Sequence, residues 1–81
     1  MDEPRAGRSS PFDEIFQQFR DPIYSYIYHL MGSAEDAEDF TQDTFVKAYV
    51  ALPNTPDDLK LKPWLYRIAT NVCLEIGRAH V

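Results

Sequence analysis

The chain has 81 residues, of which 44% are hydrophobic and 14% aromatic, and it contains a single cysteine. This length predicts one domain with a thin core, and the single cysteine excludes an internal disulfide and a cysteine-based metal framework. The first residues lack the apolar run of a signal peptide, and no stretch is long enough to span a bilayer, so we expect a cytoplasmic location.

The charge is unevenly distributed along the chain. A formal net charge of −5 argues, taken alone, against nucleic-acid binding. However, residues 33–46 contain five acids and no base, whereas residues 60–81 contain four bases and one acid. The molecule is therefore dipolar, and this asymmetry predicts two dissimilar surfaces.

The first predicted element is a long helix. Residues 1–10 contain proline, glycine and serine without an apolar period, which predicts a disordered arm. Ser10 is a candidate N-cap, with Pro11 at the first helical position. Pro22 predicts a kink or short break near Arg20–Asp21. The apolar stripe recurs at spacings of three and four and comprises Phe12, Ile15, Phe16, Phe19, Ile23, Ile27 and Leu30.

Two further helices follow. Gly32 suits a left-handed C-cap, and Ser33 is the N-cap of a second helix that extends to about Ala51. Its predicted buried stripe comprises Ala37, Phe40, Thr44, Phe45, Ala48 and Leu52. The proline-rich segment 52–62 predicts a loop, and Pro63 is the predicted first residue of a third helix. In that helix the predicted core stripe is Leu65, Ile68, Ala69 and Val72, and the adjacent face carries Trp64, Arg67, Asn71 and Glu75.

These elements predict an all-α fold, a small three-helix bundle of antiparallel helices with the first helix kinked. We expect no enzyme activity and no cofactor, because the three scattered glycines cannot cradle a phosphate and neither His29 nor His80 has metal-type spacing. Cys73 falls near the core stripe, where a buried structural thiol is the simplest interpretation.

The acidic stretch has three interpretations. Its acids, Glu35, Asp36, Glu38, Asp39 and Asp43, lie on successive turns of one helix. A hard cation needs more oxygens than one helix face offers, which disfavours a metal site. A solvated face is the plainest alternative. A protein-docking face is favoured by the mutual repulsion of the acids and by the apolar Val46 beside them.

Trp64 also has two interpretations. It is either a core residue at a helix start or part of a site for unstacked bases. In the second case its ring stacks a base, Asn71 reads a base edge, and Lys60, Lys62 and Arg67 contact phosphates.

Two motifs resemble a known family. DAEDFTQDTFVKAY followed by KPWLYRIATNVCLE resembles region 2 of the extracytoplasmic-function (ECF) sigma factors of bacteria, and FDEIFQQFRDPIYSYIYHLMGS resembles the first helix of that region. The resemblance implies binding to the clamp helices of the largest catalytic subunit of core RNA polymerase. Matched position by position, the polymerase-binding residues are Asp36, Glu38, Asp39, Gln42 and Asp43.

The resemblance also implies recognition of the promoter −10 element as it melts. One flipped base of the non-template strand enters a pocket formed by the loop before the last helix. The implied DNA-binding residues are Asn54, Lys60, Lys62, Trp64, Arg67 and Asn71.

The chain departs from the family pattern in its loop and at its end. Asp57 and Asp58 make the loop acidic, which weakens phosphate contacts. Family members continue the last helix with basic residues and add a second helical domain for the −35 element. The final EIGRAHV matches a translated reading frame of a common sequencing adapter. We therefore expect a truncated domain over residues 11–75 and a non-native tail over 76–81.

Two rival functions remain open. One is a protein-interaction module with Trp64 in its core, such as an adaptor or a target of an anti-sigma factor that covers the same faces. The other is a small metal-dependent hydrolase that uses the acidic helix.

Overall fold

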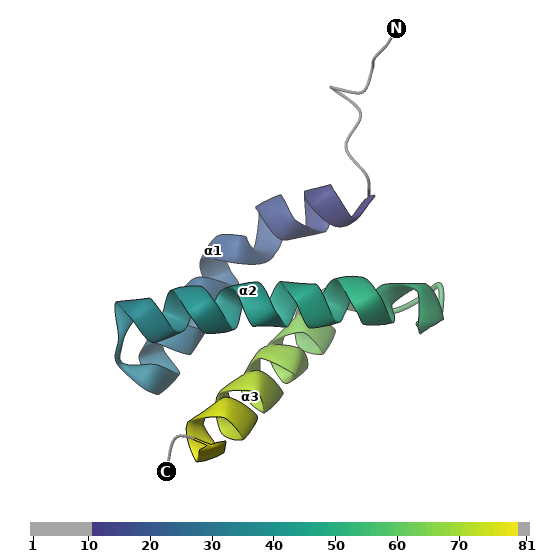
Figure 1. The fold of residues 1–81 in the computed structure, drawn as a ribbon. Helices are drawn as coiled ribbons and strands as arrows, with labels where there is room; N and C mark the ends of the chain where they lie inside the picture. Colours follow the sequence, from purple (N-terminus) through teal and green to yellow (C-terminus); the bar gives the residue numbers. More distant parts are fainter. Residues whose placement is uncertain (1–10, 80–81) are drawn as a thin grey trace, which may run out of the picture.

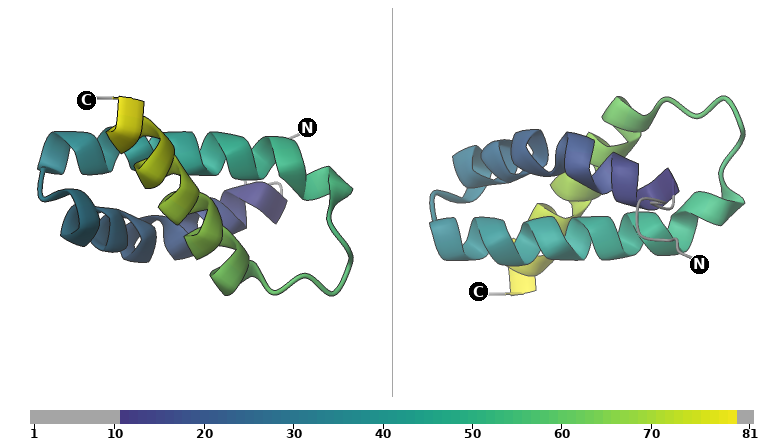
Figure 2. Two further views of the ribbon diagram at one scale, coloured as in Figure 1. Left: turned by 90° about the horizontal axis from the view of Figure 1, so that it is seen from below. Right: turned by 90° about the horizontal axis from the view of Figure 1, so that it is seen from above.

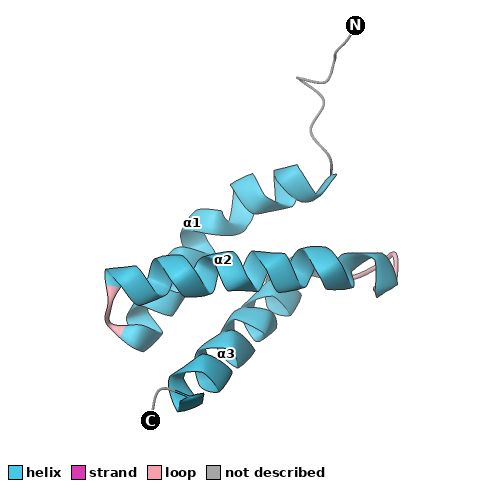
Figure 3. Cartoon of the chain, in the orientation of Figure 1, coloured by secondary structure: helices cyan, strands magenta, loops and turns pink. Residues whose placement is uncertain are grey.

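The structure is a computed structural model that describes residues 11–79, with side chains from 12 to 75. The elements are α1 (Pro11–Met31), α2 (Ala34–Ala51), a short 3-10 helix η2 (Leu52–Asn54) and α3 (Leu61–Ala79). Within this part of the chain there is no strand (Figure 3). The predicted all-α three-helix fold is confirmed. The predicted arm, and the last two residues of the predicted tail, lie outside the described residues.

Helix α1 runs unbroken through Pro22, so the short break expected near Arg20–Asp21 does not occur. Proline removes only one backbone hydrogen bond, and the apolar stripe continues in phase beyond it, with Ile23 and Ile27 completely buried, although Leu30, the last residue of the predicted stripe, is 50% exposed. Figure 1 shows α1 changing direction about midway along its length. Burial of the stripe thus keeps α1 helical across the proline.

The turn between α1 and α2 forms as its residue types predict. Gly32 has a positive φ of 73°, and its N–H donates to the Tyr28 carbonyl at 2.8 Å. Ser33 is extended, and its Oγ accepts a hydrogen bond from the Asp36 N–H at 3.3 Å. These caps satisfy backbone groups that the two helix ends leave unpaired.

The predicted stripe of α2 is buried, apart from Leu52, which is half-buried. Helix α3 begins two residues before Pro63, with the Trp64 N–H donating to the Lys60 carbonyl at 3.3 Å. In α3, Leu65, Ala69 and Val72 are fully buried and Ile68 is half-buried. The expected faces of both helices are therefore those that pack.

The three helices are not all antiparallel. Helices α1 and α2 run in opposite directions side by side, and α3 crosses both obliquely on one side of the pair (Figure 2). Each helix packs against the other two. The rings of Phe12 and Phe16 meet the Phe45 ring edge-on, with centroids 6.3 and 5.0 Å away. The Tyr26 hydroxyl lies 2.7 Å from Thr70 Oγ1, linking α1 to α3.

Among the described helices, none combines the length and apolarity required to cross a membrane.

Candidate functional site

The acidic face of α2 comprises Asp36, Glu38, Asp39, Gln42 and Asp43. The Ser33 cap fixes where α2 begins and therefore how these residues are spaced around it. Four of them are exposed. Asp36, whose backbone N–H donates to the Ser33 side chain, is half-buried. Carboxylates near a helix N-terminus interact favourably with the helix dipole. The structure thus leaves a negatively charged surface open on the first half of α2.

An apolar patch continues this surface along the second half of α2. It comprises Val46, Tyr49 and Val50, which are 62%, 62% and 68% exposed. A groove of ≈ 330 Å³ lies beside it, lined by Phe12, Phe16, Gln42, Phe45, Val46 and Tyr49. From the sequence, only Val46 was identified as an apolar residue beside the acids. Tyr49 and Val50 were missed, although their spacing from Val46 puts them on the same helix face.

The connector between α2 and α3 is organised by its own hydrogen bonds. The Leu52 carbonyl accepts bonds from the Thr55 N–H at 3.1 Å and from Thr55 Oγ1 at 2.6 Å. The Leu59 N–H donates to the Pro56 carbonyl at 3.2 Å. Asn54, Lys60 and Lys62 of this region are exposed. Figure 2 shows the connector projecting beyond the three packed helices.

The α3 face comprises Trp64, Arg67 and Asn71. Arg67 and Asn71 are exposed, whereas Trp64 is half-buried and packs against the core. One portion of the indole therefore supports the core, and the rest remains accessible. Spacings of three and four put these residues along one side of α3.

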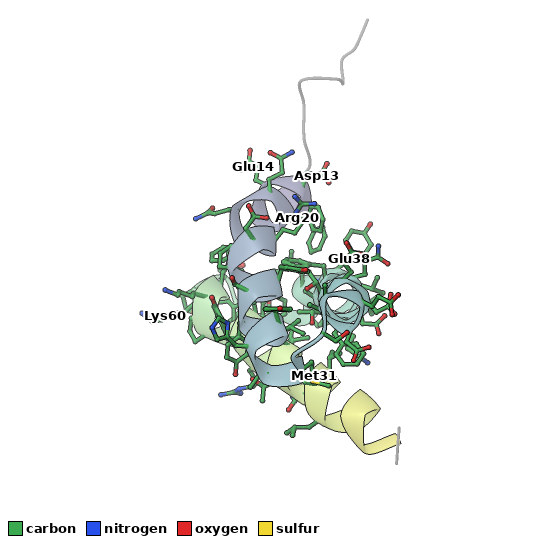
Figure 4. The ribbon with its side chains drawn as sticks, turned by 90° about the vertical axis from the view of Figure 1, so that its left-hand side faces the viewer. Asp13, Glu14, Arg20, Met31, Glu38 and Lys60 are labelled. Carbon is green, nitrogen blue, oxygen red and sulfur yellow. The ribbon has the colours of Figure 1, made fainter. Side chains whose placement is uncertain are left out.

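The connector and the acidic face lie on different sides of the molecule. In Figure 4, α1 faces the viewer with Lys60 on one side of it and Glu38 on the other. The positive end of the connector is thus kept apart from the carboxylates of α2.

The two other candidate residues, Cys73 and His29, lie in surroundings that a structural role explains. Cys73 is only 6% exposed, as expected for a structural thiol, and burial raises the pKa of this thiol. His29 is exposed, and its Nδ1 lies 3.0 Å from the Ser25 carbonyl oxygen. Across the described residues, no group of three or more His, Cys, Asp or Glu side chains is arranged to hold a metal ion.

Thr41 is the buried polar residue that the sequence prediction missed. It is 6% exposed, and among the described residues its hydroxyl has no hydrogen-bond partner. The neighbouring Thr44, by contrast, donates to the Phe40 carbonyl at 2.7 Å. The positions Ala37, Thr41, Thr44 and Ala48 have helical spacing, which could have indicated the burial of Thr41.

Comparison with known proteins identifies the class. The family model for sigma-70 region 2 matches residues 15–80. The chain is 35% identical over 71 residues to the ECF RNA polymerase sigma factor SigW of Bacillus subtilis, covering 88% of this chain and 38% of that protein. It is 36% identical over 72 residues to SigG, an ECF RNA polymerase sigma factor of Mycobacterium tuberculosis, covering 89% of this chain and 20% of that protein.

A third relative, the ECF RNA polymerase sigma factor SigM of Bacillus subtilis, is 34% identical over 68 residues, which are 84% of this chain and 41% of that protein. The chain belongs to the sigma-70 region 2 family and is similar to the ECF group of RNA polymerase sigma factors. It spans about two-fifths or less of the length of these relatives.

Proposed function

We propose that this domain docks on bacterial core RNA polymerase through the acidic face of α2 and holds the melted non-template strand of the −10 element with the connector and α3. It acts by binding, in the cytoplasm, and not by catalysis. The observation that carries the proposal is an exposed acidic face on α2 together with exposed bases, Lys60, Lys62 and Arg67, on the connector and α3 of one small helical body. Membership of the sigma-70 region 2 family supports it.

The polymerase contact follows from the charges of α2. Asp39 and Asp43 are exposed and lie one turn apart, so they offer paired acceptors to Arg or Lys side chains of a partner helix. Glu38 and Gln42 widen the same surface. The partner in this proposal is the clamp-helix pair of the largest catalytic subunit.

The strand contact follows from the chemistry of α3 and the connector. The accessible part of the Trp64 ring can stack a base that has left the duplex, a contact worth about 1–3 kcal/mol. The amide of Asn71 can pair with a base edge. Lys60, Lys62 and Arg67 supply phosphate contacts. Capture of an extruded base stabilises the open duplex without any catalytic step.

A protein-interaction role is the second candidate, and the exposed patch of Val46, Tyr49 and Val50 favours it. An anti-sigma factor that covers the acidic face and the α3 face would use the same residues. Specific binding of a −10 non-template oligonucleotide distinguishes the two roles, because only the promoter role requires it.

Separate substitutions test the two surfaces. Asp39→Lys should abolish binding to core polymerase and leave single-strand binding intact or improved. Asn71→Ala should weaken strand binding and leave polymerase binding unchanged. Both affinities are measured for both variants by fluorescence anisotropy, with unfolding curves to verify folding. Identical losses in both assays would contradict the existence of two functional surfaces.

A further inference from the structure

A second groove lies between α1 and α2, beside the acidic face. It has a volume of ≈ 440 Å³, and its lining includes Arg20, Asp21 and Tyr24 from α1 and Glu38, Thr41 and Gln42 from α2. Glu38 and Gln42 thus belong to the groove as well as to the acidic face. Figure 4 shows Arg20 and Glu38 on the same side of the molecule, on neighbouring helices. A protein docked on the acidic face therefore reaches the groove.

The groove contains a polar group without a partner. Thr41 is more than nine-tenths buried, and among the described residues nothing hydrogen-bonds to its hydroxyl. A buried hydroxyl left unpaired lowers the stability of the folded chain. The oxygen is closed to solvent, but Thr41 itself lines the groove. To bond a group in the groove, this hydroxyl must turn by rotation about the Cα–Cβ bond.

The charge of the groove favours a cation. Its charged lining residues are two carboxylates, Asp21 and Glu38, and one base, Arg20. Arg20 Nε lies 3.6 Å from Asp21 Oδ1, and these side chains are 58% and 88% exposed. The Arg20 guanidinium carbon is 5.9 Å from the centre of the Phe16 ring. Exposed ion pairs of this kind are weak, so Arg20 is displaced at little cost.

We propose that this groove receives an arginine side chain from the protein that docks on the acidic face, an inference that rests on the proposed polymerase contact. A guanidinium supplies several N–H donors in one plane. The acceptors available are the carboxylates of Asp21 and Glu38, the carbonyl of Gln42 and the hydroxyl of Thr41. The Tyr24 ring offers a face on which the same plane can stack. Arginine fits this lining better than lysine, which is a point charge without a stacking surface.

Thr41→Val gives the sharpest test, because binding and stability should respond differently. The substitution keeps the shape and removes the unpaired hydroxyl, so the free chain should unfold at an equal or higher urea concentration. Affinity for core RNA polymerase should fall by about tenfold or more, the value of one hydrogen bond to a charged group. If Thr41 had a purely structural role, its substitution would lower both the stability and the affinity, or neither.

Two further variants test the charge of the bound group. Asp21→Asn, outside the acidic face, should weaken polymerase binding by about tenfold, the value of one charged hydrogen bond. Arg20→Ala should leave the affinity unchanged or increase it. Glu14→Gln is the matched control: an exposed acid on the same helix, away from the groove (Figure 4). It should change the affinity by less than about twofold, as expected for a distant exposed charge.

Unchanged affinity in both Thr41→Val and Asp21→Asn would overturn the groove proposal while the polymerase contact stands. A loss with Arg20→Ala equal to that with Asp21→Asn would also overturn it, because Arg20 would then contribute to binding and would not be the base that the incoming guanidinium displaces. If the unmodified chain does not bind core polymerase, the proposed function fails instead.

An NMR titration tests the groove without polymerase. N-acetylarginine amide should shift the backbone amide signals of Tyr24, Thr41 and Gln42 saturably at millimolar concentration, and Asp21→Asn should abolish the shifts. The neutral citrulline analogue is the control and should cause none. Absence of saturable shifts with the arginine compound would overturn the proposal independently of any polymerase result.

Discussion

Replacement of Phe45 by alanine is expected to remove a large part of the stability of this domain. Phe45 is 3% exposed, and its ring lies edge-on to Phe16 at 5.0 Å and to Phe12 at 6.3 Å. Truncation of a buried phenylalanine costs about 3–5 kcal/mol, which includes lost contacts and the cavity that remains. The two ring contacts favour the upper part of that range, since aromatic pairs add to area burial.

The expected loss of stability in Phe45→Ala is large relative to the total free energy of unfolding. At ~0.05–0.15 kcal/mol per residue, a chain of 81 residues has a free energy of unfolding of about 4–12 kcal/mol. The assay is urea unfolding followed by far-UV circular dichroism. Val46→Ala is the matched control, because the adjacent residue is 62% exposed and should change stability by less than about 0.5 kcal/mol. A Phe45→Ala loss below about 1 kcal/mol, or equal losses in the two variants, would refute the packing described for α1 and α2.

Three other changes have defined outcomes. Gly32→Ala should lower the free energy of unfolding by about 1–2 kcal/mol through its positive φ alone, because no atom lies within 4 Å of the added Cβ; a neutral result in urea unfolding would contradict the left-handed turn. Tyr26→Phe and Thr70→Val should each cost about 0.5–1.5 kcal/mol, and the double variant should cost less than their sum, since both remove one 2.7 Å contact; strict additivity would argue against that bond. Burial raises the pKa of the Cys73 thiol, so the folded chain retains this proton more strongly than the unfolded chain. Stability should therefore fall as the pH rises above the ordinary thiol pKa, and Cys73→Ala should show a weaker decline in alkaline urea titrations; the same decline in both proteins would exclude Cys73 as the cause.

The boundaries of α2 were predictable because local chemistry determines them. Ser33 caps the helix through a side-chain oxygen, and Gly32 takes a backbone conformation that other residues resist. The buried stripe was predictable for the same kind of reason, since helical spacing assigns apolar residues such as Phe40 and Phe45 to one face.

The remaining features depend on tertiary packing. Spacing predicts which face of α3 is apolar, but not the angle at which α3 crosses the other helices, which depends on how side-chain ridges fit together. The continuity of α1 across Pro22 depends on the burial of Ile23 and Ile27. The burial of Thr41 was not predicted because its side chain is polar. The groove forms only where two helices come together, so the residue pattern of neither helix indicates it.

The candidate residues were selected by their chemistry, by their spacing and by the resemblance to sigma factor region 2, and the structure adds their exposure. Glu38, Asp39, Gln42, Asp43, Arg67 and Asn71 are exposed. Asp36 and Trp64 are half-buried because one supports a helix start and the other the core. Their contacts with polymerase and DNA stay predictions, as do the domain boundary at residue 75 and the non-native origin of residues 76–81. Helix α3 itself continues to Ala79.

Site-specific photo-cross-linking tests the central claim most directly. The photoreactive residue p-benzoylphenylalanine is introduced at Asp39 or at Asn71, and the chain is mixed with core polymerase and a −10 non-template oligonucleotide before irradiation. The account predicts that position 39 cross-links to the largest polymerase subunit and position 71 to the oligonucleotide. Cross-links from both positions to the same molecule would contradict the assignment of two partners to two faces.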